Sequence, residues 1–321
     1  MNNAGGRVVQ GNGTQSENQR RRLLALAYAG LAGSALFWAG NAVVARGVAG
    51  VIPPVTLAFW RWIVALCVVL PFSVGHVIRE RREIARQWRR LLALAIFSIA
   101  TYNTLLYIAA ETTTAVNIAL VAAAMPVLIT LLAWLALGHR PRVRQSMGIT
   151  TSLAGMLIII ARGRWQTIAN LNFNPGDLIM IVAVTCWAAY SVLLRKFTVM
   201  LHPLAFLTAL IVFGLAVLLP LYAWEALTGP AFRFHVRYLP AIGYVGVFPS
   251  VFAYTFWNNG VAVAGPSRAA MFLYLMPVFT AALALIFLGE HLHLFHAAGG
   301  VLILFGLYLA TVQRKADTSP S

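Results

Sequence analysis

Ten apolar segments, each close to the length of a membrane-spanning helix, occupy most of this 321-residue chain. A helix needs roughly 20 apolar residues to cross the hydrocarbon core of a bilayer. Only 10% of the residues are charged, against about 25% in a soluble domain, so the chain has too little polar surface to face water all round. We predict an all-α integral membrane protein in contact with the lipid bilayer, with spans at approximately 23–45, 55–75, 91–110, 114–137, 146–162, 177–194, 203–224, 240–263, 267–288 and 295–312.

The basic residues indicate how the spans are oriented. Most of the 24 Lys and Arg lie in the two tails and in every second connection, most densely at 79–90. Because cytoplasmic connections are enriched in Lys and Arg, we predict that both termini are cytoplasmic and expect a multi-pass protein of the cell (inner) membrane. The net charge of +16 is explained by these connections. No nucleic-acid partner is expected, since that requires a basic face on a folded domain.

The second half of the chain repeats the first. Residues 121–139 read VAAAMPVLITLLAWLALGH, and residues 272–290 read FLYLMPVFTAALALIFLGE. At the same offset Gly148 and Gly155 recur as Gly299 and Gly306, and at a slightly smaller offset Trp38, Arg46 and Pro54 recur as Trp187, Arg195 and Pro203. The chain therefore divides into a disordered cytoplasmic N-tail (1–22), a first repeat (23–162), a connecting loop (163–176), a second repeat (177–312) and a cytoplasmic C-tail (313–321).

Each repeat contains an odd number of spans, so the second copy must enter the membrane from the opposite side. Inverted repeats of this kind predict alternating access, with substrate bound near the midplane between the halves. Pro126 and Pro277 interrupt corresponding spans, and we interpret them as hinge positions because proline removes a backbone donor and permits bending.

Several segments carry a resemblance to a known family. The first half contains FWAGNAVVARGV (37–48), PPVTLAFWRW (53–62) and AAAMPVLITLLAWLALG (122–138). The second contains GDLIMIVAVTCWAAYSVLLRK (176–196), MPVFTAALALIFLGE (276–290) and HAAGGVLILFGLYL (296–309). Together they resemble the drug/metabolite transporter superfamily with two EamA domains. The resemblance implies ten helices, no cofactor, and export of small metabolites such as amino acids, or of toxic compounds.

Polar and aromatic side chains inside the spans indicate a substrate site. Groups that are costly at membrane depth usually face the bundle interior or a wet cavity. Those on the first, third, sixth and eighth spans could line an aromatic cavity with amide donors and acceptors, suited to a zwitterion or a flat aromatic compound. The alternatives are interfacial aromatic belts and helix packing. The candidates are Trp38, Asn41, Tyr102, Asn103, Trp187, Tyr190, Tyr254, Trp257 and Asn258.

Arg61 lies a few residues inside the second span, and its counterpart in the second repeat is Leu210. It could bind a substrate carboxylate, reach the interface or join helices. Glu111 and Glu290 lie at the ends of the third and ninth spans, where we expect a gate or ion-pair role and no coupling residue. EHLHLFH (290–296) lies at a membrane boundary, and no metal is expected there.

These features together predict a secondary transporter, and an exporter of amino acids or related small metabolites in particular. A carrier of toxic cations or of nucleotide sugars from the same superfamily is the alternative. An enzyme is not expected, because the chain has only eight Asp and Glu and no clustered acids for a metal. The small-molecule substrate's identity, the coupling ion and the direction of transport stay open, and a monomer is the simplest oligomeric state.

Overall fold

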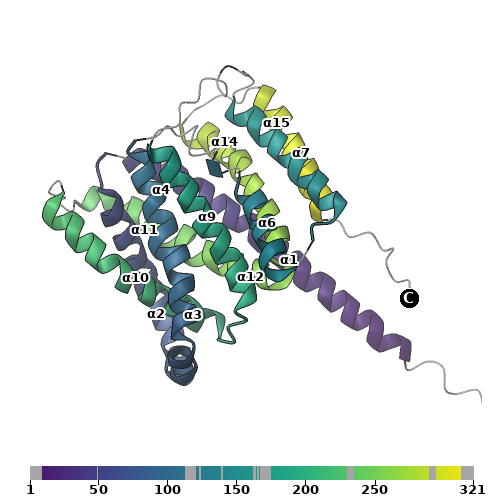
Figure 1. Cartoon of the computed structure of the whole chain (residues 1–321), viewed down its shortest axis with the longest axis horizontal. Coiled ribbons are helices and arrows are strands. Elements are labelled where there is room, and N and C mark those ends of the chain that lie inside the picture. Colours follow the sequence, from purple (N-terminus) through teal and green to yellow (C-terminus); the bar gives the residue numbers. More distant parts are fainter. Residues whose placement is uncertain are drawn as a thin grey trace, which may run out of the picture.

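The computed structural model describes residues 9–48, 50–112, 121–122, 124–138, 140–161, 164, 166, 175–229, 235–288 and 294–311. Within these ranges the chain is helical, with short turns and no strand (Figure 1). The elements are α1 (Val9–Val48), α2 (Pro54–Arg86), α3 (Trp88–Ala95), η1 (Ile96–Tyr102), α4 (Asn103–Ala110), α6 (Met125–Leu137), α7 (Val143–Ile160), α9 (Pro175–Lys196), α10 (Pro203–Thr228), η2 (Val236–Tyr238), α11 (Leu239–Val247), η3 (Phe248–Phe252), α12 (Ala253–Ala264), α13 (Pro266–Met271), η4 (Phe272–Tyr274), α14 (Leu275–Leu288) and α15 (Leu294–Thr311).

The helices follow the predicted spans. The third span is built from α3, η1 and α4, the eighth from η2 to α12, and the ninth from α13 to α14. Among the described residues, six helical stretches are long and apolar enough to cross a membrane, and α6 and most of α15 are shorter apolar helices. The part of the fourth span before residue 121 lies outside the described residues.

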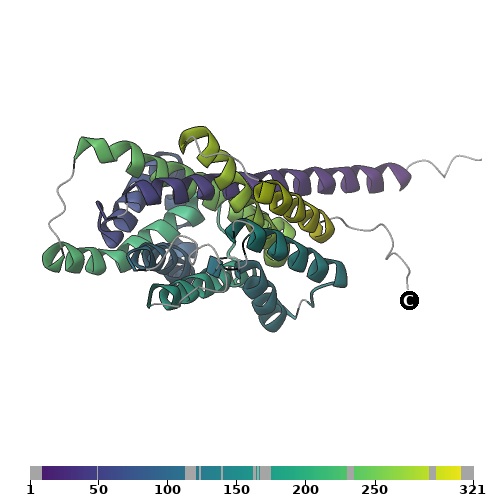
Figure 2. The same ribbon diagram turned by 90° about the horizontal axis from the view of Figure 1, so that it is seen from above.

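Two boundaries differ from the prediction. α1 begins at Val9, so the prediction of a disordered tail over 1–22 is wrong from that residue onward, and this part projects from the bundle (Figure 2). α2 continues to Arg86 through the basic segment. Both extensions contain Glu and Arg, which are good helix formers, and extending an existing helix requires no new nucleation.

The helices pack in pairs that a two-fold axis between the halves would generate. α2 packs against α10 and α7 against α15, each pair joining the same span of the two repeats. α1 packs against α12 and α14, and correspondingly α9 packs against α4 and α6. Because these cross-contacts of the described helices have counterparts, the two repeats have the same fold and share one pseudo-two-fold axis.

Glycines allow α7 and α15 to approach very closely, side by side (Figure 1). A Cβ added to Gly148 would lie 2.6 Å from the Gly306 carbonyl oxygen, and one added to Gly155 would lie 2.6 Å from that of Gly299. Between these contacts the Ser152 hydroxyl donates to the Ile303 carbonyl at 3.3 Å. Gly148, the first of the two glycines in α7, meets Gly306, the second of the pair in α15, and Gly155 meets Gly299. The helices are therefore antiparallel and the repeats are inverted.

A carboxylate near the end of each of α2 and α10 accepts hydrogen bonds from the backbone at the start of the other helix. Glu225, near the end of α10, accepts from the backbone N–H groups of Val55 and Thr56 at 3.0 and 2.6 Å. Glu80, late in α2, accepts from the backbone N–H of His202 at 2.9 Å. A carboxylate at a helix N-terminus satisfies orphan donors and complements the helix dipole. The pair is therefore fastened at both ends in this structure.

Candidate functional site

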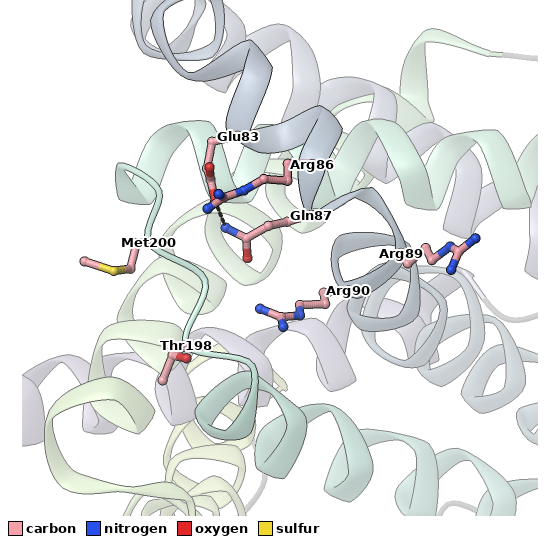
Figure 3. A pocket seen from close by; sticks show the side chains of 7 residues that line it. All are labelled: Glu83, Arg86, Gln87, Arg89, Arg90, Thr198 and Met200. Atoms are coloured by element: carbon pink, nitrogen blue, oxygen red, sulfur yellow. Dashed lines mark hydrogen bonds and ion pairs between the residues drawn. The ribbon is translucent and has the colours of Figure 1, made fainter.

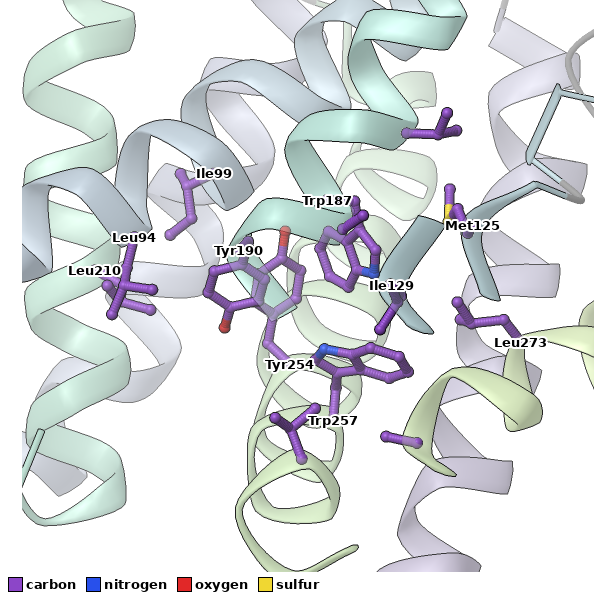
Figure 4. Close-up of a cluster of buried hydrophobic side chains, with 14 of the residues drawn as sticks. Leu94, Ile99, Met125, Ile129, Trp187, Tyr190, Leu210, Tyr254, Trp257 and Leu273 are labelled. Carbon is purple, nitrogen blue, oxygen red and sulfur yellow. The ribbon is translucent and has the colours of Figure 1, made fainter. Parts of the chain in front are cut away.

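A cluster of aromatic side chains lies where the two repeats meet (Figure 4). Trp187 of α9 is at its centre, with ring centroids 5.4 Å from Tyr254, 5.7 Å from Trp257 and 5.3 Å from Tyr190. Tyr102 approaches Trp187 to 4.9 Å. Trp187, Tyr190, Tyr254 and Trp257 are buried, and together with Tyr102 they come from three different spans of the sequence.

The repeat explains why the cluster forms here. Trp38 and Trp187 occupy equivalent positions in the two halves, and their rings meet edge to face at 5.1 Å and 89°. A residue that touches its own counterpart must lie close to the axis relating the halves. The Trp38 indole nitrogen also donates to the Pro249 carbonyl at 3.1 Å, which ties α1 to η3.

Two π-helical segments flank the cluster, one in each half. η1 contains Ser98 and ends at Tyr102, and η3 contains Ser250 and ends just before Tyr254. Such segments are rare and occur frequently at functional sites. The two Ser–Tyr pairs share one offset, slightly larger than those of the other repeat matches. That shared spacing marks the two serines, and likewise the two tyrosines, as equivalent positions of the repeats.

Arg61 is fully buried and joins three helical elements. Its Nε donates to the Ser250 hydroxyl at 2.9 Å, and its Nη1 donates to Asn103 Oδ1 at 3.0 Å and to the Tyr107 hydroxyl at 2.8 Å. Asn103 in turn donates to the Tyr254 hydroxyl at 3.2 Å, and that hydroxyl donates to the Ser98 carbonyl at 3.0 Å. Arg61 therefore does not reach toward the membrane surface; its guanidinium lies within the bundle, linked to both π-helical segments.

Several buried donors around this network have no hydrogen-bond partner. They are the second terminal nitrogen of Arg61, Nη2, and the indole nitrogens of Trp62, Trp187 and Trp257. Within the part of the chain that the structure describes, Arg61 forms no ion pair with a carboxylate. Trp62 was not among the predicted site residues, because its neighbours in space come from other helices.

The remaining predicted polar residues are two asparagines, Asn41 and Asn258, and two glutamates, Glu111 and Glu290. Asn41 is buried with Oδ1 unpartnered, and Asn258 accepts a hydrogen bond from the Tyr190 hydroxyl. Glu111 is exposed at the end of α4, away from the network described above, and Glu290 lies outside the described residues.

The two prolines do not interrupt a continuous helix. Pro126 lies in the first turn of α6, where proline is well tolerated because that N–H has no intrahelical acceptor. Pro277 lies in the first turn of α14, directly after the 3₁₀ segment η4. In the ninth span the irregular segment directly precedes Pro277, where a proline removes a backbone hydrogen bond, and the hinge role of both prolines stays a prediction.

A separate cavity of about 650 Å³ lies at the junction of α2 and α3, beside the connection from α9 to α10 (Figure 3). Arg90 crosses to that connection and donates to the Phe197 carbonyl at 3.4 Å. The cavity shares no residue with the aromatic cluster. It is lined by Glu83, Arg86, Gln87, Arg89, Arg90, Thr198 and Met200.

Comparison with known proteins agrees with this architecture. The EamA-like transporter family matches residues 25–161 and again 174–312. The uncharacterized transporter YyaM of Bacillus subtilis is 28% identical over 88% of this chain and 93% of its own length. The uncharacterized inner membrane transporter YedA of Escherichia coli is 25% identical over 82% of this chain and 83% of its own. A solved crystal structure, 20% identical, superposes with a TM-score of 0.72 over 91% of this chain and 96% of that one, which shows the fold alone.

Proposed function

We propose a function from one premise: the chain belongs to the EamA-like transporter family, so it is a multi-pass membrane transporter and not an enzyme. The proposal is that it is a secondary carrier that exports small metabolites, and amino acids or related compounds in particular. Transport proceeds by alternating access between the two inverted repeats. We further propose that the protein resides in the inner membrane with both termini in the cytoplasm, which the distribution of basic residues supports.

The observation that carries the proposal is the buried polar network at the aromatic cluster. A fully buried guanidinium with an unpartnered nitrogen is expensive in a lipid-embedded core and is expected where function requires it. The surrounding Trp and Tyr rings offer apolar faces for a small organic side chain. An α-amino acid combines the two properties, since it carries a carboxylate for Arg61 and a side chain for the rings.

The structure corresponds to a closed state in this scheme. The central rings are buried against one another, and α2 and α10 are fastened at both ends by Glu225 and Glu80. Opening toward one side requires that the fastening at that end be released while the other holds. The pseudo-two-fold axis makes the two openings near mirror images, which is the basis of alternating access.

Counterflow in proteoliposomes tests this function without knowledge of the coupling ion. Vesicles containing purified protein are loaded with unlabelled amino acids, and the entry of individual labelled amino acids is followed. We expect saturable exchange that is absent from protein-free vesicles. If correctly folded protein exchanges no amino acid, the proposed substrate class is wrong and other metabolites become the next to test.

A further inference from the structure

We propose that the central site recognises its substrate through the carboxylate group and does not require an ammonium group. The carboxylate would bind Arg61 and the indole N–H groups of Trp62, Trp187 and Trp257. This inference rests on the proposed function, because it names the chemical group by which that site selects its substrate. It predicts acceptance of carboxylates that lack an amine and rejection of amines that lack a carboxylate.

The unpartnered nitrogens of Arg61, Trp62, Trp187 and Trp257 belong to side chains that donate hydrogen bonds and cannot accept them. Indole and guanidinium nitrogens donate hydrogen bonds and offer no lone pair to a ligand. The three indole nitrogens and Arg61 Nη2 are buried without a partner, and a buried donor without an acceptor is unfavourable. A carboxylate accepts about four hydrogen bonds through its two oxygens, so it supplies what these groups lack.

The charge of the site points the same way. Arg61 donates to the side chains of Ser250, Asn103 and Tyr107, all of which are neutral. No carboxylate of the described residues forms an ion pair with it. A buried charge without a counter-charge is strongly unfavourable, so an anionic ligand is attracted and a cationic ligand is repelled.

The side chains that carry these donors contact one another directly or through Tyr254. The Trp62 ring lies 5.0 Å from Tyr254, and the Trp187 ring lies 5.4 Å from the same tyrosine. Trp257 lies 5.7 Å from Trp187, and the Arg61 guanidinium lies 5.2 Å from the Trp62 ring. Nε and Nη1 of Arg61 already donate to side chains of the protein. Nη2 can therefore donate a hydrogen bond to a carboxylate oxygen while those contacts hold the Arg61 side chain in place.

The first experiment compares three compounds that share one phenyl group. Phenylalanine carries both charged groups, 3-phenylpropionate only the carboxylate, and 2-phenylethylamine only the ammonium group. Binding to the purified protein is measured by intrinsic tryptophan fluorescence and by thermal stabilisation, so transport is not needed. We expect phenylalanine and 3-phenylpropionate to bind with affinities within about tenfold of each other. We expect 2-phenylethylamine to bind at least tenfold more weakly, since one charge-assisted hydrogen bond corresponds to about tenfold or more.

The second experiment removes single donors. Trp62→Phe and Trp187→Phe keep an aromatic ring but remove the indole N–H together with one ring of the fused system, and each should weaken 3-phenylpropionate binding about tenfold. Arg61→Gln should abolish it, whereas Arg140→Gln, on an exposed connection, should leave it unchanged. If Arg61→Gln does not fold, the two Trp→Phe variants still decide the question.

The outcomes separate this inference from the proposed function. If 2-phenylethylamine binds as well as 3-phenylpropionate, or if neither Trp→Phe variant weakens carboxylate binding, the inference is wrong even when amino-acid counterflow is observed. If 3-phenylpropionate binds and depends on Arg61 but amino acids show no counterflow, carboxylate recognition stands and the proposed transport of amino acids fails.

Discussion

Replacing Gly155 with Ala should destabilise the protein by about 1–3 kcal/mol, the usual cost of overpacking a well-packed interface. The added Cβ would lie 2.6 Å from the Gly299 carbonyl oxygen, 2.7 Å from Leu302 Cβ and 3.0 Å from the Ile303 backbone nitrogen. Two of these are backbone atoms that no side-chain rotation can move. Because ordinary contacts between heavy atoms are about 3.5–4.0 Å, α7 and α15 would have to separate by most of an ångström.

Gly300→Ala is the matched control. Gly300 lies in α15, next to Gly299, but among the described residues the only atom within 4 Å of its added Cβ is Val278 Cγ2 at 3.9 Å, an ordinary contact. Both substitutions remove a glycine from a helix and gain up to about 1 kcal/mol of helix propensity. That gain cancels when the two variants are compared, so the difference between them isolates the steric effect.

The assay is thermal unfolding of both purified variants in the same detergent. A difference of 1–3 kcal/mol corresponds to a Tm for Gly155→Ala roughly 2–10 °C below that of Gly300→Ala. Gly306→Ala should resemble Gly155→Ala, because its Cβ would lie 2.6 Å from the Gly148 carbonyl oxygen. Equal Tm values for Gly155→Ala and Gly300→Ala would refute the close approach of the two helices.

Three further predictions concern gating, the central network and orientation. Glu225→Ala removes the acceptor at the first turn of α2, a cap worth about 1–2 kcal/mol. A cysteine placed at Val44 of α1 should then react roughly 5- to 30-fold faster with an impermeant maleimide. Glu83→Ala is the control, because the Glu83 carboxylate contacts Arg86 and Gln87, and it should not change that rate. Ser250→Ala deprives Arg61 Nε of its acceptor and should lower kcat/KM about tenfold, with unchanged transport counting against a role for the network. A cysteine at Arg82, in a variant lacking Cys67 and Cys186, should be labelled only from the cytoplasmic side, and labelling from outside would reverse the proposed orientation.

Much of the fold follows from patterns that a single chain displays. The positions of the spans follow from runs of apolar residues, because the bilayer imposes a minimum length on any helix that crosses it. The inversion follows from an odd number of spans per repeat. The meeting of Trp38 with Trp187 follows from their equivalence, since residues near a two-fold axis lie close to their own counterparts.

The rest depends on packing that no local pattern encodes. The hydrogen bonds of Arg61 involve residues of the third and eighth spans, so they become visible only when three helices are placed together. The π-helical segments depend on how each span accommodates its neighbours, and their Ser98 and Ser250 are ordinary residues in an apolar sequence. The helix before Leu23 was missed because polar composition was taken to indicate disorder, although its residues favour helix.

The glycine contact between α7 and α15 is isologous, meaning that one face of the repeat unit meets the same face of its copy. Contacts of this kind are the ones that two identical chains make. Each half therefore carries the surface by which it recognises the other, and joining the halves in one chain raises their effective concentration. Two half-chains made separately should assemble in opposite orientations. Covalent fusion then has a different consequence: it allows the halves to diverge, so that Arg61 can occupy one side of the axis and Leu210 the other.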